Sequence, residues 1–186
     1  KPDRRQRQMC IRDRKKAGEL GFLGVGVPEE YGGLGMSFTS TMLVCDYISG
    51  SSGSTSTAFG AHTGIGTMPI LLYGNEEQKN KYVPKLASGE HFGAYCLTEP
   101  GAGSDANSGK TKAVLSKDKS HYLISGQKIW ISNAGFADIL TVFAKIEDDK
   151  NLTAFIVPND PDNGISMGNE EEKLGLNSSS TRQVFF

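Results

Sequence analysis

Hydrophobic and polar positions follow two different periods in the two halves of the chain. Up to about residue 92 the apolar residues recur at the three- and four-residue spacing of helices. Beyond that point, short runs alternate apolar with polar residues, and polar turns separate them at close spacing, which is typical of antiparallel strands. The sequence therefore predicts an α+β chain, with a helical domain over 15–92 followed by a small antiparallel β-barrel or β-sandwich over 93–186.

Capping and breaking residues divide the first half into four expected helices. They are Ala17–Leu23, a helix after the cap Ser37 that includes Met42–Ile48, Ala58–Leu72, and Glu76–Ala87 with an interruption at Pro84. The Ser- and Gly-rich stretch Ser49–Thr57 indicates an exposed loop. His62 stands alone on an apolar helix, which favours a satisfied core or interface histidine over a base.

Alternation in the second half predicts pairs of short strands across polar turns. Besides the two stretches discussed below, the expected strands are Thr111–Leu115, Tyr122–Gly126, Ile139–Ile146, Thr153–Val157, Ile165–Met167 and Gln183–Phe186.

Composition narrows the possible partners. A net charge of −1 argues against nucleic acid or an anionic membrane as the main partner. No apolar run approaches the ~20 residues of a membrane span. The three cysteines lack paired spacing, which indicates a reducing compartment, and no His/Cys cluster suits a metal.

Both ends of the sequence look cut. Residues 1–14 are rich in Arg and Gln and are expected to be a charged helix or a disordered basic tail; a nucleic-acid arm is disfavoured because the chain is near neutral. The run Met9–Arg14 also looks like translated adapter sequence, so this piece is expected to be non-native. The first residue is Lys1 rather than Met, and Thr181–Phe186 reads as a strand interrupted in the middle.

One stretch of the second half combines a short strand with a loop of glycine and polar residues. Tyr95–Asp105 begins as a short apolar strand, stops at Pro100 and continues as a glycine loop. Gly101 and Gly103 permit positive φ and close approach of a ligand to the main chain, and the Ser104 hydroxyl follows them. Such a loop suits a phosphate or the polar edge of a flat ring, although a simple turn also explains it.

A second stretch, Gly126–Asn133, holds the only tryptophan. Alternation predicts Ile129 and Ile131 on one strand face and Trp130 with Ser132 on the other. A large ring and a small hydroxyl would then line one surface. The alternative is an ordinary strand with a half-buried core tryptophan.

Together the two stretches resemble the flavin motifs of the acyl-CoA dehydrogenase family. They read YCLTEPGAGSD and GQKIWISN, in the order and at the separation that the family shows. The continuation Ala137–Lys145 is most similar to the very-long-chain branch, and the likeness extends from about Lys15 to Phe186. It implies part of an N-terminal helical domain and most of a middle β domain that binds flavin, with the family's C-terminal helical bundle missing from this fragment.

The resemblance implies an oxidoreductase, an FAD-dependent flavoprotein that oxidises long-chain acyl-CoA in fatty acid β-oxidation, a part of lipid metabolism. In the family a carboxylate removes the α-proton, the β-hydrogen leaves as hydride to the flavin, and trans-2-enoyl-CoA forms. The implied partners are acyl-CoA, an electron-transferring flavoprotein and further copies in a homo-oligomer. The implied compartment is the bacterial cytoplasm or the mitochondrial matrix, and membrane association is left open.

The resemblance also assigns roles to residues of both motifs. Backbone groups of Tyr95 and Leu97 and the Thr98 hydroxyl would bond the ring edge, Trp130 would cover one ring face, and Ser132 would bond the reactive flavin nitrogen. The full implied cofactor set is Tyr95, Cys96, Leu97, Thr98, Gly101, Gly103, Ser104, Trp130, Ile131 and Ser132, with Ser104 also the expected substrate contact.

The chain departs from the family pattern at two points. The family's catalytic base lies on the C-terminal helical domain beyond Phe186, so no residue is assigned as catalytic and the fragment is expected to be inactive alone. Glu99 does not match that base. In the run Lys173–Thr181, Asn177 replaces the usual basic residue, which would weaken a contact to a phosphate or a neighbouring subunit; Ser179 receives no role.

Two other functions remain open on the sequence. One is a flavin oxidase or monooxygenase of the same fold, which would form peroxide instead of reducing an electron-transferring flavoprotein. The other is a catalytically silent flavin- or acyl-CoA-binding assembly module, which an absent carboxylate at the base position would favour.

Overall fold

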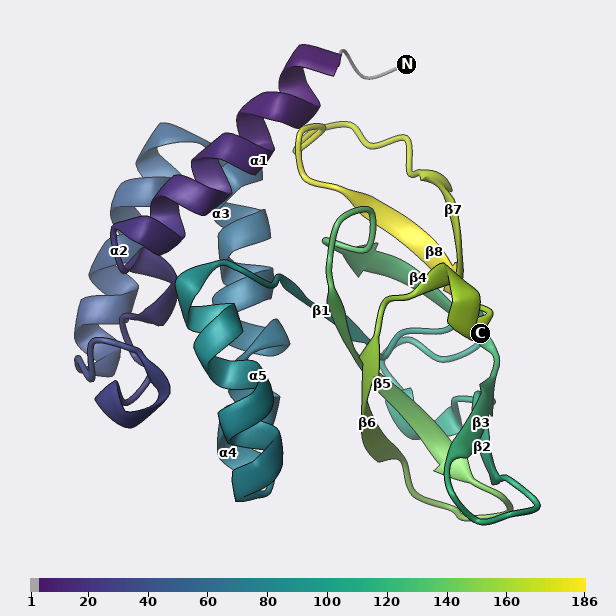
Figure 1. The fold of residues 1–186 in the computed structure, drawn as a ribbon. Helices are drawn as coiled ribbons and strands as arrows, with labels where there is room; N and C mark the ends of the chain where they lie inside the picture. Colours follow the sequence, from purple (N-terminus) through teal and green to yellow (C-terminus); the bar gives the residue numbers. More distant parts are fainter. Residues whose placement is uncertain (1–3) are drawn as a thin grey trace. The chain divides into compact units, whose positions relative to one another are not determined.

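The computed structural model describes residues 4–186, which divide into two compact units. The helical unit comprises the residues up to 93 together with 172–179, and the β unit comprises 94–171 with 180–186. The α-helices belong to the first unit and the strands gather in the second (Figure 1). The predicted α+β class, with helices before strands, is therefore confirmed.

Side-chain caps fix the ends of several helices in the helical unit. Ser37 accepts a hydrogen bond from the Ser40 amide, as predicted, and Asn75 forms a capping box with Gln78. Gly89, with φ of 74°, ends the last helix. The helices are α1 (Arg4–Glu19), α2 (Phe38–Ser51), α3 (Gly53–Gly60), the π-helix η3 (Ala61–Gly66), α4 (Met68–Tyr73) and α5 (Glu76–Ser88), with 3-10 turns η1 (Phe22–Gly24) and η2 (Glu29–Tyr31).

Two predicted boundaries in the helical unit are wrong. The helix expected over Ala17–Leu23 ends at Glu19, because Gly21 adopts φ of 77° and the chain continues as the 3-10 turn η1. The loop expected over Ser49–Thr57 is mostly helical. The Ser52 side chain accepts from the Thr55 amide, so this polar stretch supplies the N-cap of α3.

Two further helix predictions need correction. The helix expected over Ala58–Leu72 changes to π-helical bonding in η3 before α4 begins. By contrast, α5 continues through Pro84, where an interruption was predicted. Its buried face, with Val83 and Leu86 both at 0% exposure, stabilises the helix despite the missing proline N–H.

The basic stretch 1–14 belongs to α1 from Arg4 onward, and residues 1–3 lie outside the described part of the chain. Among the described residues, no helix combines the length and the apolar character that crossing a membrane requires.

His62 is a satisfied core histidine, as predicted. Its Nδ1 accepts from the Gly93 amide at 3.0 Å, so the neutral ring carries its proton on Nε2, which donates to the Leu86 carbonyl at 3.0 Å. Burial lowers the pKa of this fully enclosed ring to about 4. The imidazole thereby links η3 to the end of α5 and to the residue that begins the first strand.

Two sheets make up the β unit. In the first, β1 (Gly93–Cys96), β5 (Ile139–Ile146), β2 (Lys112–Leu115) and β3 (Tyr122–Ser125) lie in the order β1-β5-β2-β3, and β6 (Thr153–Pro158) also pairs with β5. In the second, β8 (Thr181–Phe185) lies between β4 (Gln127–Ser132) and β7 (Ser166–Glu170). The 3-10 turns η4 (Ala106–Ser108) and η5 (Pro161–Asn163) complete the unit.

The described strands form two sheets and not a closed barrel, so the sandwich form of the prediction holds. The pairing is mostly antiparallel, but β2 and β5 are parallel, with Lys112 opposite Lys145. One apolar core joins both sheets, because inward-facing side chains of each contribute to it. Its buried members are Ala94, Cys96, Ile131, Ala134, Ala137, Leu140, Val142, Ile165 and Val184.

Candidate functional site

The two sequence motifs meet where the chain leaves β1 and passes along β4. The Ile129 amide donates to the Thr98 carbonyl at 2.9 Å. The Lys128 ammonium donates to the Leu97 carbonyl at 3.0 Å and to Glu99 Oε1 at 2.8 Å. Backbone and side-chain bonds therefore hold the glycine motif against the tryptophan motif within the β unit.

A buried ion pair, which the sequence did not reveal, anchors this junction. The Lys128 side chain is 0% exposed and that of Glu99 is 6% exposed. Glu99 also accepts from the amides of Lys110 at 2.6 Å and Thr111 at 3.1 Å. A fully buried charge is tolerated only when it is paired and hydrogen-bonded, and both conditions are met here.

The electrostatics keep Glu99 ionised. Burial opposes its charge, but the hydrogen bonds from Lys128 and from the residues 110–111 outweigh burial and lower the pKa of this carboxyl to about 2. Burial lowers the pKa of Lys128, and the bond to Glu99 partly offsets that effect. Both carboxylate oxygens of Glu99 thus accept hydrogen bonds from the surrounding chain, and the residue anchors the junction of the two motifs.

A β-bulge turns the tryptophan outward. The register of β4 against β8 shifts between Lys128 and Ile131, and Trp130 adopts φ of 59°, a costly conformation for a bulky residue. Lys128 and Ile131 consequently both point inward, while Trp130 is 58% exposed. The bulge adds one residue to β4 between Lys128 and Ile131, so the unbroken alternation expected of this strand does not hold over its whole length.

The glycine loop begins with a tight turn. Glu99 and Ala102 exchange two backbone hydrogen bonds of 3.1 Å around Pro100 and Gly101. Neither Gly101 nor Gly103 adopts positive φ, so the conformational freedom expected of them is not used. A Cβ on either would meet no atom within 4 Å, so this loop faces open space.

The predicted site residues fall into three groups by burial. Cys96 and Ile131 belong to the core, and burial raises the pKa of the Cys96 thiol to about 12. Tyr95 is half-buried, with its ring centroid 4.8 Å from that of Phe143. Leu97, Thr98 and Ser132 are also half-buried, whereas Gly101, Gly103, Ser104 and Trp130 are exposed.

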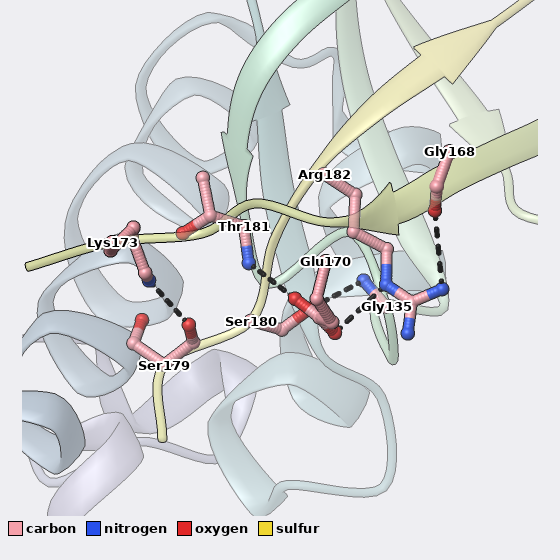
Figure 2. Close-up of polar contacts among 8 residues, drawn as sticks. All are labelled: Gly135, Gly168, Glu170, Lys173, Ser179, Ser180, Thr181 and Arg182. Carbon is pink, nitrogen blue, oxygen red and sulfur yellow. Dashed lines mark hydrogen bonds and ion pairs between the residues drawn. The ribbon is translucent and has the colours of Figure 1, made fainter. Parts of the chain in front are cut away.

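Outside the two motifs, the run Lys173–Thr181 has its own internal bond. Lys173 Nζ donates to the Ser179 carbonyl at 2.6 Å (Figure 2), the Ser179 side chain is buried, and Asn177 is exposed. In the described part of the chain, no group of three or more His, Cys, Asp or Glu side chains is arranged to hold a metal ion.

Two family models match nearly the whole chain. The acyl-CoA dehydrogenase N-terminal domain matches residues 3–90, and the acyl-CoA dehydrogenase middle domain matches residues 94–186. The two matched domains correspond to the helical unit and to the β unit that carries the two motifs, so fold and motifs point to the same class of protein. The chain belongs to the acyl-CoA dehydrogenase family.

Relatives from bacteria and mammals are similar over almost all of this chain. A probable acyl-CoA dehydrogenase of Bacillus subtilis is 52% identical over 96% of the chain and 30% of its own length. The human very long-chain specific mitochondrial acyl-CoA dehydrogenase is 44% identical over 90% of the chain and 27% of its own length. The chain thus spans about a third or less of these two relatives.

Among solved structures, an acyl-CoA dehydrogenase from Bacillus anthracis complexed with FAD superimposes with a TM-score of 0.90. It is 49% identical, and the match covers 95% of this chain and 30% of that one.

Proposed function

We propose that this chain forms the flavin-binding part of an FAD-dependent acyl-CoA dehydrogenase. The observation that carries the proposal is the junction of the two motifs, in which the Thr98 carbonyl accepts from Ile129 beside the outward-turned Trp130. Family membership and the FAD complex of the Bacillus anthracis relative support it.

The residues at the junction fit a flat ring with a polar edge. Trp130 offers an exposed aromatic face, and Thr98 and Ser132 offer half-buried hydroxyls. The Leu97 carbonyl already accepts a hydrogen bond from Lys128. Of the backbone groups of Leu97, only the N–H would therefore bond the ring edge. The open loop at Gly101 and Gly103 would admit a phosphate-bearing ligand close to the main chain.

In this proposal the protein orients the flavin ring and the substrate, and the cofactor carries the redox chemistry. Bound FAD would supply the hydride acceptor for oxidation of a saturated acyl thioester. Trp130 would cover one ring face and exclude water from it, and the Ser132 hydroxyl would hold the ring's reactive edge. Ser104, exposed on the glycine loop, would contact the CoA portion of the substrate. Cys96 and Ile131 would contribute through backbone and packing, because their side chains are buried in the core.

We further propose long-chain acyl-CoA as the substrate and trans-2-enoyl-CoA as the product, in fatty acid β-oxidation. The similarity to the very long-chain specific human relative supports this substrate class. The base that removes the α-proton would come from outside these 186 residues, because Glu99 is held by Lys128 and the chain spans only 27–30% of the relatives compared above. The chain by itself would then be inactive.

The partners we propose follow from the same assignment. An electron-transferring flavoprotein would reoxidise the cofactor, and the intact protein would assemble from several copies. We propose either the bacterial cytoplasm or the mitochondrial matrix as the compartment, because both are reducing and would keep thiols such as that of Cys96 free.

Anaerobic titration of the purified full-length protein tests the proposal. Acyl-CoA thioesters from short to very long chain are added, and bleaching of the flavin absorbance is followed. We expect bleaching that is fastest with long chains, release of a 2-enoyl thioester, and reoxidation by electron-transferring flavoprotein. Rapid peroxide formation in air would instead identify an oxidase, and flavin that no thioester bleaches would identify a silent binding module.

A further inference from the structure

The carboxylate of Glu170, at the end of β7, accepts three hydrogen bonds from Ser180 and from the first two residues of β8 (Figure 2). The Thr181 amide donates to Oε2 at 2.9 Å. The Ser180 hydroxyl and Arg182 Nε both donate to Oε1 at 2.8 Å. Neither Glu170 nor Arg182 belongs to the two motifs, and nothing in the sequence pattern singles them out.

The geometry and the surroundings keep Glu170 charged. Burial opposes ionisation, but the bonds from Thr181, Ser180 and Arg182 outweigh it and lower the pKa of this carboxyl. The side chains of Glu170 and Arg182 are 31% and 22% exposed, so solvent screens the pair only in part. Charge-assisted bonds of this kind are shorter and stronger than neutral ones.

Ser180 relays this anchor to the turn that follows β4. Its hydroxyl accepts from the Gly135 amide at 3.1 Å, and its carbonyl accepts from the Asn133 amide at 3.0 Å. A hydroxyl has one proton, and since that proton is given to Glu170, a lone pair is directed at Gly135. The orientation of the Ser180 hydroxyl therefore depends on the carboxylate.

The turn itself needs such support. Asn133 adopts φ of 66°, and its carbonyl closes the turn by accepting from the amides of Phe136 at 3.0 Å and Ala137 at 2.8 Å. The cluster packs directly against the turn, because a Cβ on Gly135 would lie 2.4 Å from Ser180 Oγ and 3.0 Å from Glu170 Oε1. A glycine is required here for close approach.

Ser132 lies between two parts of the chain that this cluster holds. Asn133, the next residue, is bound to Ser180, and Thr181, the residue paired with Ser132 across β4 and β8, donates its amide to Glu170. Any shift of the carboxylate would therefore reach Ser132 from both directions.

We propose that Glu170, acting through Ser180 and Thr181, is a positioning residue that holds the Ser132 hydroxyl against the edge of a bound flavin. The inference rests on the proposed function, in which Ser132 contacts that ring. It assigns a role in cofactor orientation to an acidic residue about forty positions away in sequence from the motif that it serves.

The test compares Glu170→Ala with Glu172→Ala in the purified full-length protein, because Glu172 is a nearby but exposed glutamate. Hydrogen exchange at the Asn133 and Gly135 amides, the affinity for added FAD and the visible spectrum of bound FAD are measured. Losing a charged hydrogen-bond partner should speed exchange at both amides on the order of tenfold and weaken FAD binding by about the same factor. Glu172→Ala should change neither.

A double-variant series separates positioning from general stability. In a Ser132→Ala background, Glu170→Ala should cause no further change in the FAD spectrum, because the group that it positions is gone. Glu170→Gln keeps the shape and one acceptor oxygen, so it should fold normally and show a smaller effect in the same direction.

Three outcomes would overturn the inference. If amide exchange accelerates while FAD affinity and spectrum stay unchanged, Glu170 holds only the turn and the proposed function stands. Additive effects of Glu170→Ala and Ser132→Ala would also exclude positioning through Ser132. If the unaltered protein binds no FAD, both the inference and the proposed function fail together.

Discussion

Among the described residues, each unit fully buries a basic side chain, and the two units satisfy that side chain differently. In the helical unit His62 is 0% exposed and neutral, bonded to the backbone of Leu86 and Gly93. In the β unit Lys128 is 0% exposed and paired with Glu99 at 2.8 Å. Both groups tie distant segments together, but only the second does so with opposite charges.

This difference predicts that the two buried anchors lose stability at different pH values. A neutral histidine loses an acceptor when it is protonated, so mild acid opposes the His62 arrangement. The Lys128–Glu99 pair stays ionised until the carboxylate is protonated, and the pKa of Glu99 is about 2. The anchor of the helical unit should therefore weaken at a much higher pH than the anchor that joins the motifs.

The largest expected effect comes from breaking the charged anchor. Lys128→Met leaves Glu99 buried without its partner, which should lower the free energy of unfolding by about 3–5 kcal/mol and release flavin. Chemical denaturation and flavin content measure the two effects. Lys112→Met is the matched control, since its 3.6 Å pair with Asp148 is exposed and should contribute almost nothing.

Removing both charges sharpens that result. The double variant Lys128→Met with Glu99→Gln should regain part of the lost stability, because the unpaired charge is gone. A double variant less stable than Lys128→Met alone would contradict the account of the pair.

The next effect is the pH dependence of the neutral anchor. The pKa of His62 is about 4 in the folded chain and 6.5 when exposed, so its contribution is present above pH 6.5 and is lost as pH falls toward 4. From pH 7 to pH 5 this should cost about 2 kcal/mol. Denaturation midpoints of the unaltered protein and of His62→Gln at both pH values measure the contribution of His62 to this pH dependence. An identical pH slope in the variant would contradict it.

A comparable effect is expected from the close contact that Gly66 makes near His62. A Cβ on Gly66 would lie 2.9 Å from both the Ala61 carbonyl oxygen and the Gly93 carbonyl carbon, whereas one on Gly60 would meet nothing within 4 Å. Gly66→Ala should destabilise by about 1–3 kcal/mol through overpacking, and Gly60→Ala, inside a helix, should be neutral or stabilising by up to about 1 kcal/mol. Thermal unfolding of both variants compares them, and equal effects would rule out a special role for the contact.

The smallest effect separates the strain at Trp130 from its ring. Trp130→Ala and Trp130→Gly both remove the aromatic face, and both should loosen flavin retention and slow flavin reduction by substrate. Glycine adopts φ of 59° without the steric cost that alanine incurs there. The Gly variant should therefore be more stable than the Ala variant by about 1 kcal/mol. Unchanged flavin content and reduction rate in both variants would remove Trp130 from the site.

Sequence reasoning predicted the features that depend on local pattern. The order of helices and strands, the cap at Ser37 and the satisfied state of His62 follow from nearby residues, and the structure confirms them. The Ser- and Gly-rich stretch Ser49–Thr57 was wrongly predicted to be a loop, because helix caps and loops favour the same residue types. The bulge at Trp130 was missed because alternation assumes an unbroken pleat.

By itself the sequence determined the two-part α+β organisation and the two motifs that mark the family, because periodicity, turn residues and motif spacing are properties of neighbouring residues. Only the tertiary structure decided that Lys128 meets Glu99, that Trp130 turns outward, and that Glu170 supports the turn after β4. Pairing across sheets joins residues far apart in the chain, and such contacts leave no period for a sequence to display.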